Sequence, residues 1–337
     1  MGVKATKITK HNNSSKFSLK RNHNNVYDQD TSSPRLHSFS NITTLANFET
    51  YSYVDGRKFH NTYILPSDYI EIKRSDYAHD IYKNRWNGNF SSPVEELLKS
   101  SEGGKVLDCG CGSGKWSYEM SIKYPNSTFL GLDMVPLFSR INNNENKPLN
   151  LGFLEYNICN GLPFQSATFN FIFQRSMTLS LTKSQWSIML KEFSRTIKPG
   201  GWLELMELQI NETYFTKTAR KFQKALNTYL EANDHYPFHD FHIYSLLRST
   251  NKFNSIRLIQ KRISVGSWGG ELGLKAADIL VEIYEGMKPT IKQIMNVTDS
   301  EYDALIQKLN NEIKSPLNDY MYVTTVRVIA MRNGVPS

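Results

Sequence analysis

Short apolar runs alternate with amphipathic stretches from residue 105 onward, and this alternation is the main organising pattern of the chain. An apolar run bounded by turn residues predicts a buried strand, and apolar positions at helical spacing predict a helix. Strands are predicted at 105–109, 127–132, 151–156, 169–173, 202–208, 253–265 and 320–331. Helices are predicted at 115–123, around 134–141, at 183–198, and at about 273–287 and 299–314. Such alternation is the pattern of a doubly wound parallel sheet.

The segments outside this pattern divide the chain further. Residues 1–47 are rich in Asn, Ser, Lys and His, and we predict a disordered basic tail there. A domain at 48–335 would then comprise a helical N-terminal extension (48–104), a core (105–210), a helical lid insertion (211–252) and the remaining part of the sheet (253–335). In the extension, residues 51–60 are expected to form a strand or turn. Asp68 is the expected cap of an amphipathic helix over Tyr69–Asp80.

Charge and composition narrow the range of partners. The 337 residues carry a net charge of +8, and residues 1–50 hold seven Lys or Arg against three acids, so about half of the excess lies in the tail. This weakens the case for nucleic-acid binding by the folded part. Cys109, Cys111 and Cys159 form no disulfide framework, which favours a reducing compartment. The chain has no predicted membrane span and no predicted signal peptide.

The first six residues, Met1-Gly2-Val3-Lys4-Ala5-Thr6, fit the pattern for N-myristoylation. One acyl chain binds membranes only marginally, so the following lysines would have to contribute electrostatic attraction. Peripheral membrane association is therefore expected only if Gly2 is acylated. The alternative is a solvated, unmodified arm.

The stretch Val106-Leu107-Asp108-Cys109-Gly110-Cys111-Gly112-Ser113-Gly114 places an acid and three alternating glycines directly after the first predicted strand. Glycine permits positive φ and a close approach of the backbone to a ligand. A dinucleotide fingerprint needs its third glycine one residue later, where this chain has Lys115. The acid also favours a ligand that carries a positive group. The stretch resembles motif I of class I, Rossmann-like methyltransferases, whose cofactor is S-adenosyl-L-methionine.

Ligands of open α/β sheets bind outside the carboxyl ends of the strands, so polar residues at the next strand ends are further candidates. Asp133 can accept the ribose hydroxyls, Asn157 and Ile158 can contact adenine, and Gln174 is expected at the mouth of the site beside Arg175. Methyltransferases usually carry Asp at the positions of Asn157 and Asn170. The predicted cofactor-binding residues are Asp108, Gly110, Cys111, Gly112, Gly114, Asp133, Met134, Asn157, Ile158 and Gln174.

The same resemblance implies a fold class: α/β, a Rossmann-like class I methyltransferase with a seven-stranded, mostly parallel sheet, helices on both faces, a helical N-terminal extension and a helical lid insertion. Pro199-Gly200-Gly201 matches the turn before the fifth strand of that family. The flanking stretches Asp55–His60, Tyr63–Asp68 and Gly266–Gly273 resemble fungal methyltransferases similar to the velvet-complex regulator of secondary metabolism. This resemblance covers about residues 48 to 332 and implies a cytoplasmic or nuclear location.

These observations predict S-adenosylmethionine-dependent methylation of an unidentified small molecule or protein. The alternative is a cofactor-binding regulator that acts through partner proteins without turnover. A nicotinamide dehydrogenase is disfavoured by Asp108 and Lys115, and nucleic-acid base methylation by the lack of its Asn/Asp-Pro-Pro-Tyr/Phe element. No residue is assigned to catalysis, but His79, Arg175 and Glu207 are candidates for a base. No metal is expected, because the aromatic and histidine-rich run from Asp234 to His242 is interpreted as part of the lid.

Overall fold

The computed structural model describes residues 51–238, 243–317 and 320–334. The predicted tail at 1–47 and the acylation of Gly2 lie outside the described residues, as does the end of the Asp234–His242 run. Within the described ranges, no helix has both the length and the hydropathy that a membrane crossing requires.

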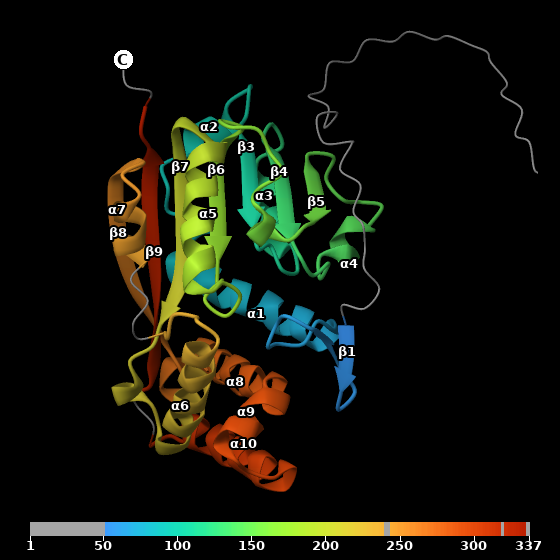
Figure 1. Cartoon of the computed structure of the whole chain (residues 1–337), viewed down its shortest axis with the longest axis vertical. Helices are drawn as coiled ribbons and strands as arrows, with labels where there is room; N and C mark the ends of the chain where they lie inside the picture. Colours follow the sequence, from blue (N-terminus) through green and yellow to red (C-terminus); the bar gives the residue numbers. More distant parts are fainter. Residues whose placement is uncertain (1–50, 239–242, 318–319, 335–337) are drawn as a thin grey trace, which may run out of the picture. The chain divides into compact units, whose positions relative to one another are not determined.

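A seven-stranded sheet forms the core of the domain (Figure 1). The strand order is β5-β4-β3-β6-β7-β9-β8. All pairs from β5 to β7 are parallel, whereas β9 is antiparallel to both of its neighbours. This confirms the predicted α/β fold with a mostly parallel sheet. The strands are β3 (Lys105–Cys109), β4 (Thr128–Asp133), β5 (Leu151–Glu155), β6 (Phe169–Arg175), β7 (Ile197–Gln209), β8 (Phe253–Ser264) and β9 (Tyr322–Arg332).

Helices bury both faces of this sheet, which explains why its central strands are almost continuously apolar. On one face, α3 (Lys115–Lys123) stacks the ring of Trp116 on Phe173, with ring centroids 4.2 Å apart. Leu107 and Ile172 point to the opposite face, because side chains alternate along a strand, and both are fully buried. Helix α5 (Lys183–Thr196) packs against β7.

Local signals account for most element boundaries. The predicted helices at 115–123 and 299–314 coincide with α3 and α10 (Asp299–Lys314). Thr298 begins α10 through a capping box with Glu301, and the Asp68 carboxylate accepts from the backbone N–H groups of Ile70 and Glu71 at the start of α1 (Tyr69–Trp86). Helix α1 extends six residues beyond the predicted 69–80 and stops at Asn87, which has a left-handed conformation.

Three segments differ from their predictions. The helix expected around 134–141 is reduced to α4 (Ser139–Asn142), because the Val135 N–H is bound by the Asp133 carboxylate and Pro136 has no N–H. Helix α5 ends at Thr196 rather than 198. The predicted turn at Pro199-Gly200-Gly201 is a bulge inside β7, since Ile197 pairs with Phe169 but Trp202 pairs with Phe171.

A second hydrophobic core lies at the end of the sheet to which the arrows of β3, β4 and β6 point in Figure 1. It includes residues of α1 and of the segment before it, together with α6, α8, α9 and α10. Helix α8 contacts both α1 and α10, and α6 contacts α9 and α10. The helices that cover the carboxyl ends of the strands therefore come from the parts of the chain before and after the core at 105–210. Besides α1, the helices of this cover are α6 (Lys217–Ala232), α8 (Gly270–Gly286), α9 (Lys288–Met295), which the sequence pattern did not predict, and α10.

The remaining elements are short. A hairpin of β1 (Tyr51–Val54) and β2 (Arg57–His60) precedes α1 and agrees with the strand or turn predicted there. Helix α2 (Glu95–Lys99) leads into β3, and α7 (Ile243–Ser249) contacts β8. None of these four elements lines the cavity at the carboxyl ends of the central strands.

Candidate functional site

A cavity of about 440 Å³ lies between the carboxyl ends of the central strands and the helical cover. This volume is within the range of small-molecule sites. Eight of the ten predicted cofactor-binding residues line it: Asp108, Gly110, Cys111, Gly112, Asp133, Met134, Asn157 and Ile158. Gly114 and Gln174 do not. Most of the predicted residues therefore meet in one place, although they come from three different strand ends.

The three glycines of the loop after β3 all have positive φ, but their surroundings differ. Apart from its chain neighbours, a Cβ on Gly112 would have only the Ser75 Oγ within 4 Å, at 3.7 Å, so the space beside Gly112 is open. A Cβ on Gly114 would approach the Phe153 ring to 2.7 Å. Gly112 thus leaves room for a ligand, whereas Gly114 allows the start of α3 to pack closely.

Asp133, at the end of β4, holds this loop in place. Its carboxylate accepts from the backbone N–H of Gly112 at 2.8 Å and from that of Val135 at 3.0 Å. Burial raises its pKa, while these backbone donors lower it. Each carboxylate oxygen can accept a further hydrogen bond. Asp133 therefore supports the loop and also retains acceptor capacity at the cavity.

Asp108, the acid that precedes the glycines, is buried and accepts a hydrogen bond from the Ser117 hydroxyl at 2.7 Å. Burial raises its pKa to about 6. A cation that binds beside a buried carboxyl lowers the pKa of that carboxyl and favours its charged form. The arrangement suits a positively charged ligand group.

Asn157 and Ile158 lie at the β5 end of the cavity. Asn157 Oδ1 accepts from the Cys159 N–H at 2.9 Å and caps the short 3₁₀ turn Ile158–Asn160, which holds Ile158 in a buried position. Asn170, the other Asn where the family usually has Asp, accepts from the backbone N–H of Lys105 at the opposite end of the sheet. Of these two asparagines, only Asn157 lines the cavity and can contact a ligand there.

Gln174 occupies a different place from the predicted mouth of the site. It is fully buried, and strand alternation turns it to the opposite face of β6 from Phe173 and Arg175. Arg175, the next residue, lines the cavity instead. Gln174 was predicted at the cavity, but its neighbour Arg175 is the residue that lines it, because successive residues of a strand face opposite sides of the sheet.

Of the three candidate bases, only Glu207 keeps suitable chemistry. His79 is buried outside the cavity lining, with Nε2 3.2 Å from Glu119 Oε2 and Nδ1 3.2 Å from an Arg175 amino nitrogen. Burial lowers the pKa of Arg175, but a guanidinium in a protein remains protonated and has no acceptor. Neither residue can serve as a base for a ligand in the cavity.

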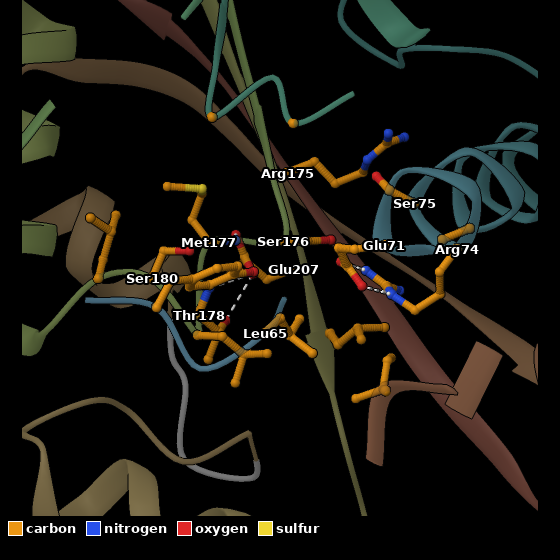
Figure 2. A pocket seen from close by; sticks show the side chains of 18 of the residues that line it. Leu65, Glu71, Arg74, Ser75, Arg175, Ser176, Met177, Thr178, Ser180 and Glu207 are labelled. Carbon is orange, nitrogen blue, oxygen red and sulfur yellow. Dashed lines mark hydrogen bonds and ion pairs between the residues drawn. The ribbon is translucent and has the colours of Figure 1, made fainter. Parts of the chain in front are cut away.

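Glu207 lies at the carboxyl end of β7 and lines the cavity. Its carboxylate accepts from Met177 N at 2.8 Å, from Thr178 N at 3.2 Å and from Thr178 Oγ1 at 2.8 Å. Figure 2 shows these groups on one side of the cavity and the Glu71–Arg74 pair from α1 on the other. These donors to Glu207 are neutral, and burial raises its pKa to about 7.

The sequence pattern did not indicate that α1 and α8 line the cavity. Helix α8 presents Ala276, Ile279, Leu280 and Ile283 to it, and α1 presents Ala78 and Ile81. The spacing of three or four residues does predict one buried helix face. It does not show which other surface that face meets.

One potential metal-ligand group occurs among the described residues, formed by His79, Asp80 and Glu119. It lies outside the cavity lining. Lys115 Nζ is 2.6 Å from Asp80, and Lys83 Nζ is 2.7 Å from Glu119. These ammonium groups already neutralise the carboxylates, which disfavours a cation.

Comparison with known proteins identifies the domain that contains the glycine loop. Residues 106–201 match a family model described as a methyltransferase domain. The chain carries a class I methyltransferase domain. S-adenosylmethionine is the cofactor of this domain class, so it is the ligand against which the cavity is to be tested.

Individual relatives of this methyltransferase domain are distant. The methyltransferase str2 of Strobilurus tenacellus is 28% identical over 152 residues, which are 45% of this chain and 51% of that protein. The secondary metabolism regulator laeA of Coprinopsis cinerea is 26% identical over 178 residues, 51% of this chain and 42% of that protein. The chain thus matches about half the length of these relatives. Among solved structures, phosphoethanolamine N-methyltransferase 2 of Haemonchus contortus with S-adenosyl-L-methionine aligns with a TM-score of 0.44 at 14% identity, covering 82% of this chain and 62% of that one.

The residues of the cavity fit S-adenosylmethionine on their own chemistry. The space beside Gly112 is open, a buried carboxylate at Asp108 is poised to receive a cation, and Asp133 offers acceptors at the next strand end. The cofactor carries an ammonium, a sulfonium and a ribose. The Asp108 carboxylate is complementary to the positive charge of the cofactor, and the acceptors of Asp133 are complementary to its ribose hydroxyls.

Proposed function

We propose that the protein transfers a methyl group from S-adenosylmethionine to a small, largely apolar molecule. The observation that carries this proposal is the continuity of one cavity. From the cofactor candidates at the ends of β3, β4 and β5, its lining continues to aliphatic side chains of α1, α6 and α8. A regulator without turnover needs only the part of the cavity that binds the cofactor. The aliphatic part is suited to an apolar acceptor held beside the cofactor.

Within this proposal, the residues divide according to the part of the cofactor that they face. Asp108 and the glycine loop would hold the methionine part, Asp133 the ribose, and Asn157 with Ile158 the adenine. Cys111 and Met134 complete the lining between them.

The cofactor supplies a methyl group on a sulfonium, which is already an activated donor. The protein is then required to orient the acceptor and to exclude water. The helical cover provides the exclusion, because α8 packs on α1 over the strand ends. Glu207 provides a buried carboxyl that can take a proton at neutral pH from an acceptor hydroxyl or amine.

The alternative, a cofactor-binding regulator, is supported by the similarity to secondary metabolism regulators. The two functions separate in one experiment. The purified full chain is incubated with S-adenosylmethionine labelled in its methyl group and with a cell extract divided into protein and organic-soluble fractions. We expect label to enter an organic-soluble compound. Label in the protein fraction alone would refute the small-molecule acceptor, and tight cofactor binding without labelling of either fraction would favour the regulator.

A further inference from the structure

Arg175 is a cation at the cavity without an acidic partner among the residues that the structure describes. Its guanidinium contacts His79 Nδ1 at 3.2 Å and lies over the Tyr82 ring, with 5.1 Å from Cζ to the ring centroid. No described carboxylate comes within 4 Å of it. Burial excludes water from the guanidinium, and this lowers the pKa of Arg175. A desolvated cation without a counterion is costly, so the site favours an anionic ligand group.

The other arginines near the centre of the molecule are already paired. Arg74 makes two hydrogen bonds to Glu71, at 2.6 and 2.8 Å, although it also lines the cavity. Arg327 lies 3.4 Å from Glu204 and is fully buried away from the cavity. Arg175 is therefore the guanidinium of the three that can receive an anion without losing an existing partner.

The strand register places Arg175 beside the glycine loop. Asp108 on β3 is paired with Phe173 on β6, so Arg175, two residues further along β6, points to the same face of the sheet as Asp108. The two charges attract each other, since Arg175 lowers the pKa of Asp108, but they form no ion pair. A carboxylate and a guanidinium thus stand on one face without neutralising each other directly.

This combination is complementary to an α-amino acid, which carries an ammonium and a carboxylate on one carbon. An arginine can bind a carboxylate through two parallel hydrogen bonds. We propose that Arg175 binds the α-carboxylate of the methionine part of S-adenosylmethionine, while Asp108 faces its ammonium. This inference rests on the proposed function only as far as cofactor binding. A carboxylate on the acceptor has the same chemistry and is the alternative source.

Calorimetric titration without turnover tests the assignment. The ligands are S-adenosylmethionine and its decarboxylated form, which keeps the sulfonium and the amine. The variants are Arg175→Met, which removes the charge at similar length, and Arg220→Met as a matched control on the exposed surface of α6 outside the cavity lining. We expect Arg175→Met to weaken S-adenosylmethionine binding by about 10- to 100-fold. The decarboxylated ligand should bind that variant as well as, or better than, the unmodified protein.

The ratio of the two dissociation constants is the decisive quantity, because a general loss of folding lowers both affinities together. Equal weakening of both ligands by Arg175→Met would overturn the proposal and indicate a role in shaping the site. Unchanged affinity for both would also overturn it and leave an acceptor carboxylate as the ligand of Arg175. If Arg175→Met does not fold, Arg175→Gln, which also removes the charge, serves the same comparison; a loss confined to S-adenosylmethionine supports the proposal, and a preserved ratio overturns it. Failure of the unmodified protein to bind S-adenosylmethionine would instead refute the proposed function.

Discussion

The stability of the protein should depend on pH through Glu207, and the structure specifies both the sign and the size of this effect. Burial raises the pKa of this carboxyl from 4.5 to about 7 in the folded chain. In the unfolded chain the group is solvated and titrates near its ordinary value. Between these two pKa values, the unfolded chain has lost the proton while the folded chain still holds it. The free energy of unfolding therefore falls as the pH rises from about 4.5 to about 7, and the effect is complete above 7.

The magnitude follows from the difference between the two pKa values, since each pKa unit corresponds to about 1.4 kcal/mol. Glu207 alone should remove about 3 kcal/mol of stability across this pH range. Asp108, whose pKa is raised to about 6, adds a change of the same sign at lower pH. Other groups titrate as well, so the total pH dependence of the unmodified protein does not isolate Glu207.

The variant Glu207→Gln isolates the effect, because glutamine has nearly the same size and does not titrate. The introduced amide would present one acceptor and one donor group to Met177 N and Thr178, so the stability of the variant at any single pH will be offset from that of the unmodified protein. The offset does not matter for the comparison. Urea unfolding of both proteins, followed by tryptophan fluorescence between pH 4.5 and 8, gives their difference in unfolding free energy at each pH. This difference should shift by about 3 kcal/mol in favour of the variant as the pH rises.

A difference that stays constant within about 0.5 kcal/mol, well below the size expected from linkage, would refute this reasoning. It would mean that the hydrogen bonds donated to Glu207 stabilise the ionised carboxylate enough to offset its burial. Glu207 would then be ionised in the folded state well below neutral pH. Its assignment as a carboxyl that takes up a proton at neutral pH would lose its basis.

Three further predictions concern the cofactor site and the core. Gly112→Val should abolish S-adenosylmethionine binding in calorimetry by filling the open space beside the loop, whereas Gly200→Val, which has similar positive φ and nothing within 4 Å, should bind normally; unchanged binding by Gly112→Val would contradict the site assignment. Asp133→Ala should weaken cofactor binding by about 1–3 kcal/mol, and equal affinity would show that the ribose is held elsewhere. Arg327→Met should destabilise the protein by about 3–5 kcal/mol in urea unfolding, because Glu204 would remain buried and charged without its cation; a loss below about 1 kcal/mol, the range of an exposed pair, would show that neutral donors suffice for Glu204.

The sequence by itself determined the features that depend on neighbouring residues. The alternation of strands and helices, the ends of α3 and α10, the cap at Asp68 and the glycine loop after β3 were all predicted from residues within one or two turns of each other. Periodicity, capping and positive φ are local properties, so the chain displays them before it folds. The order of polar strand ends also predicted where a cavity would form, since parallel strands bring their carboxyl ends to one edge.

Only the tertiary structure decided which side chain reaches that cavity and what covers it. Gln174 and Arg175 exchange places because the face of a strand residue depends on the register with β3 and β7. The cover combines α1 with α8, two elements nearly 200 residues apart in sequence, through apolar faces that would suit many other partners. The shifted pKa of Glu207 arises from its burial in the folded chain. Contacts between distant segments determine strand register and burial. The residues around each position therefore do not predict either property.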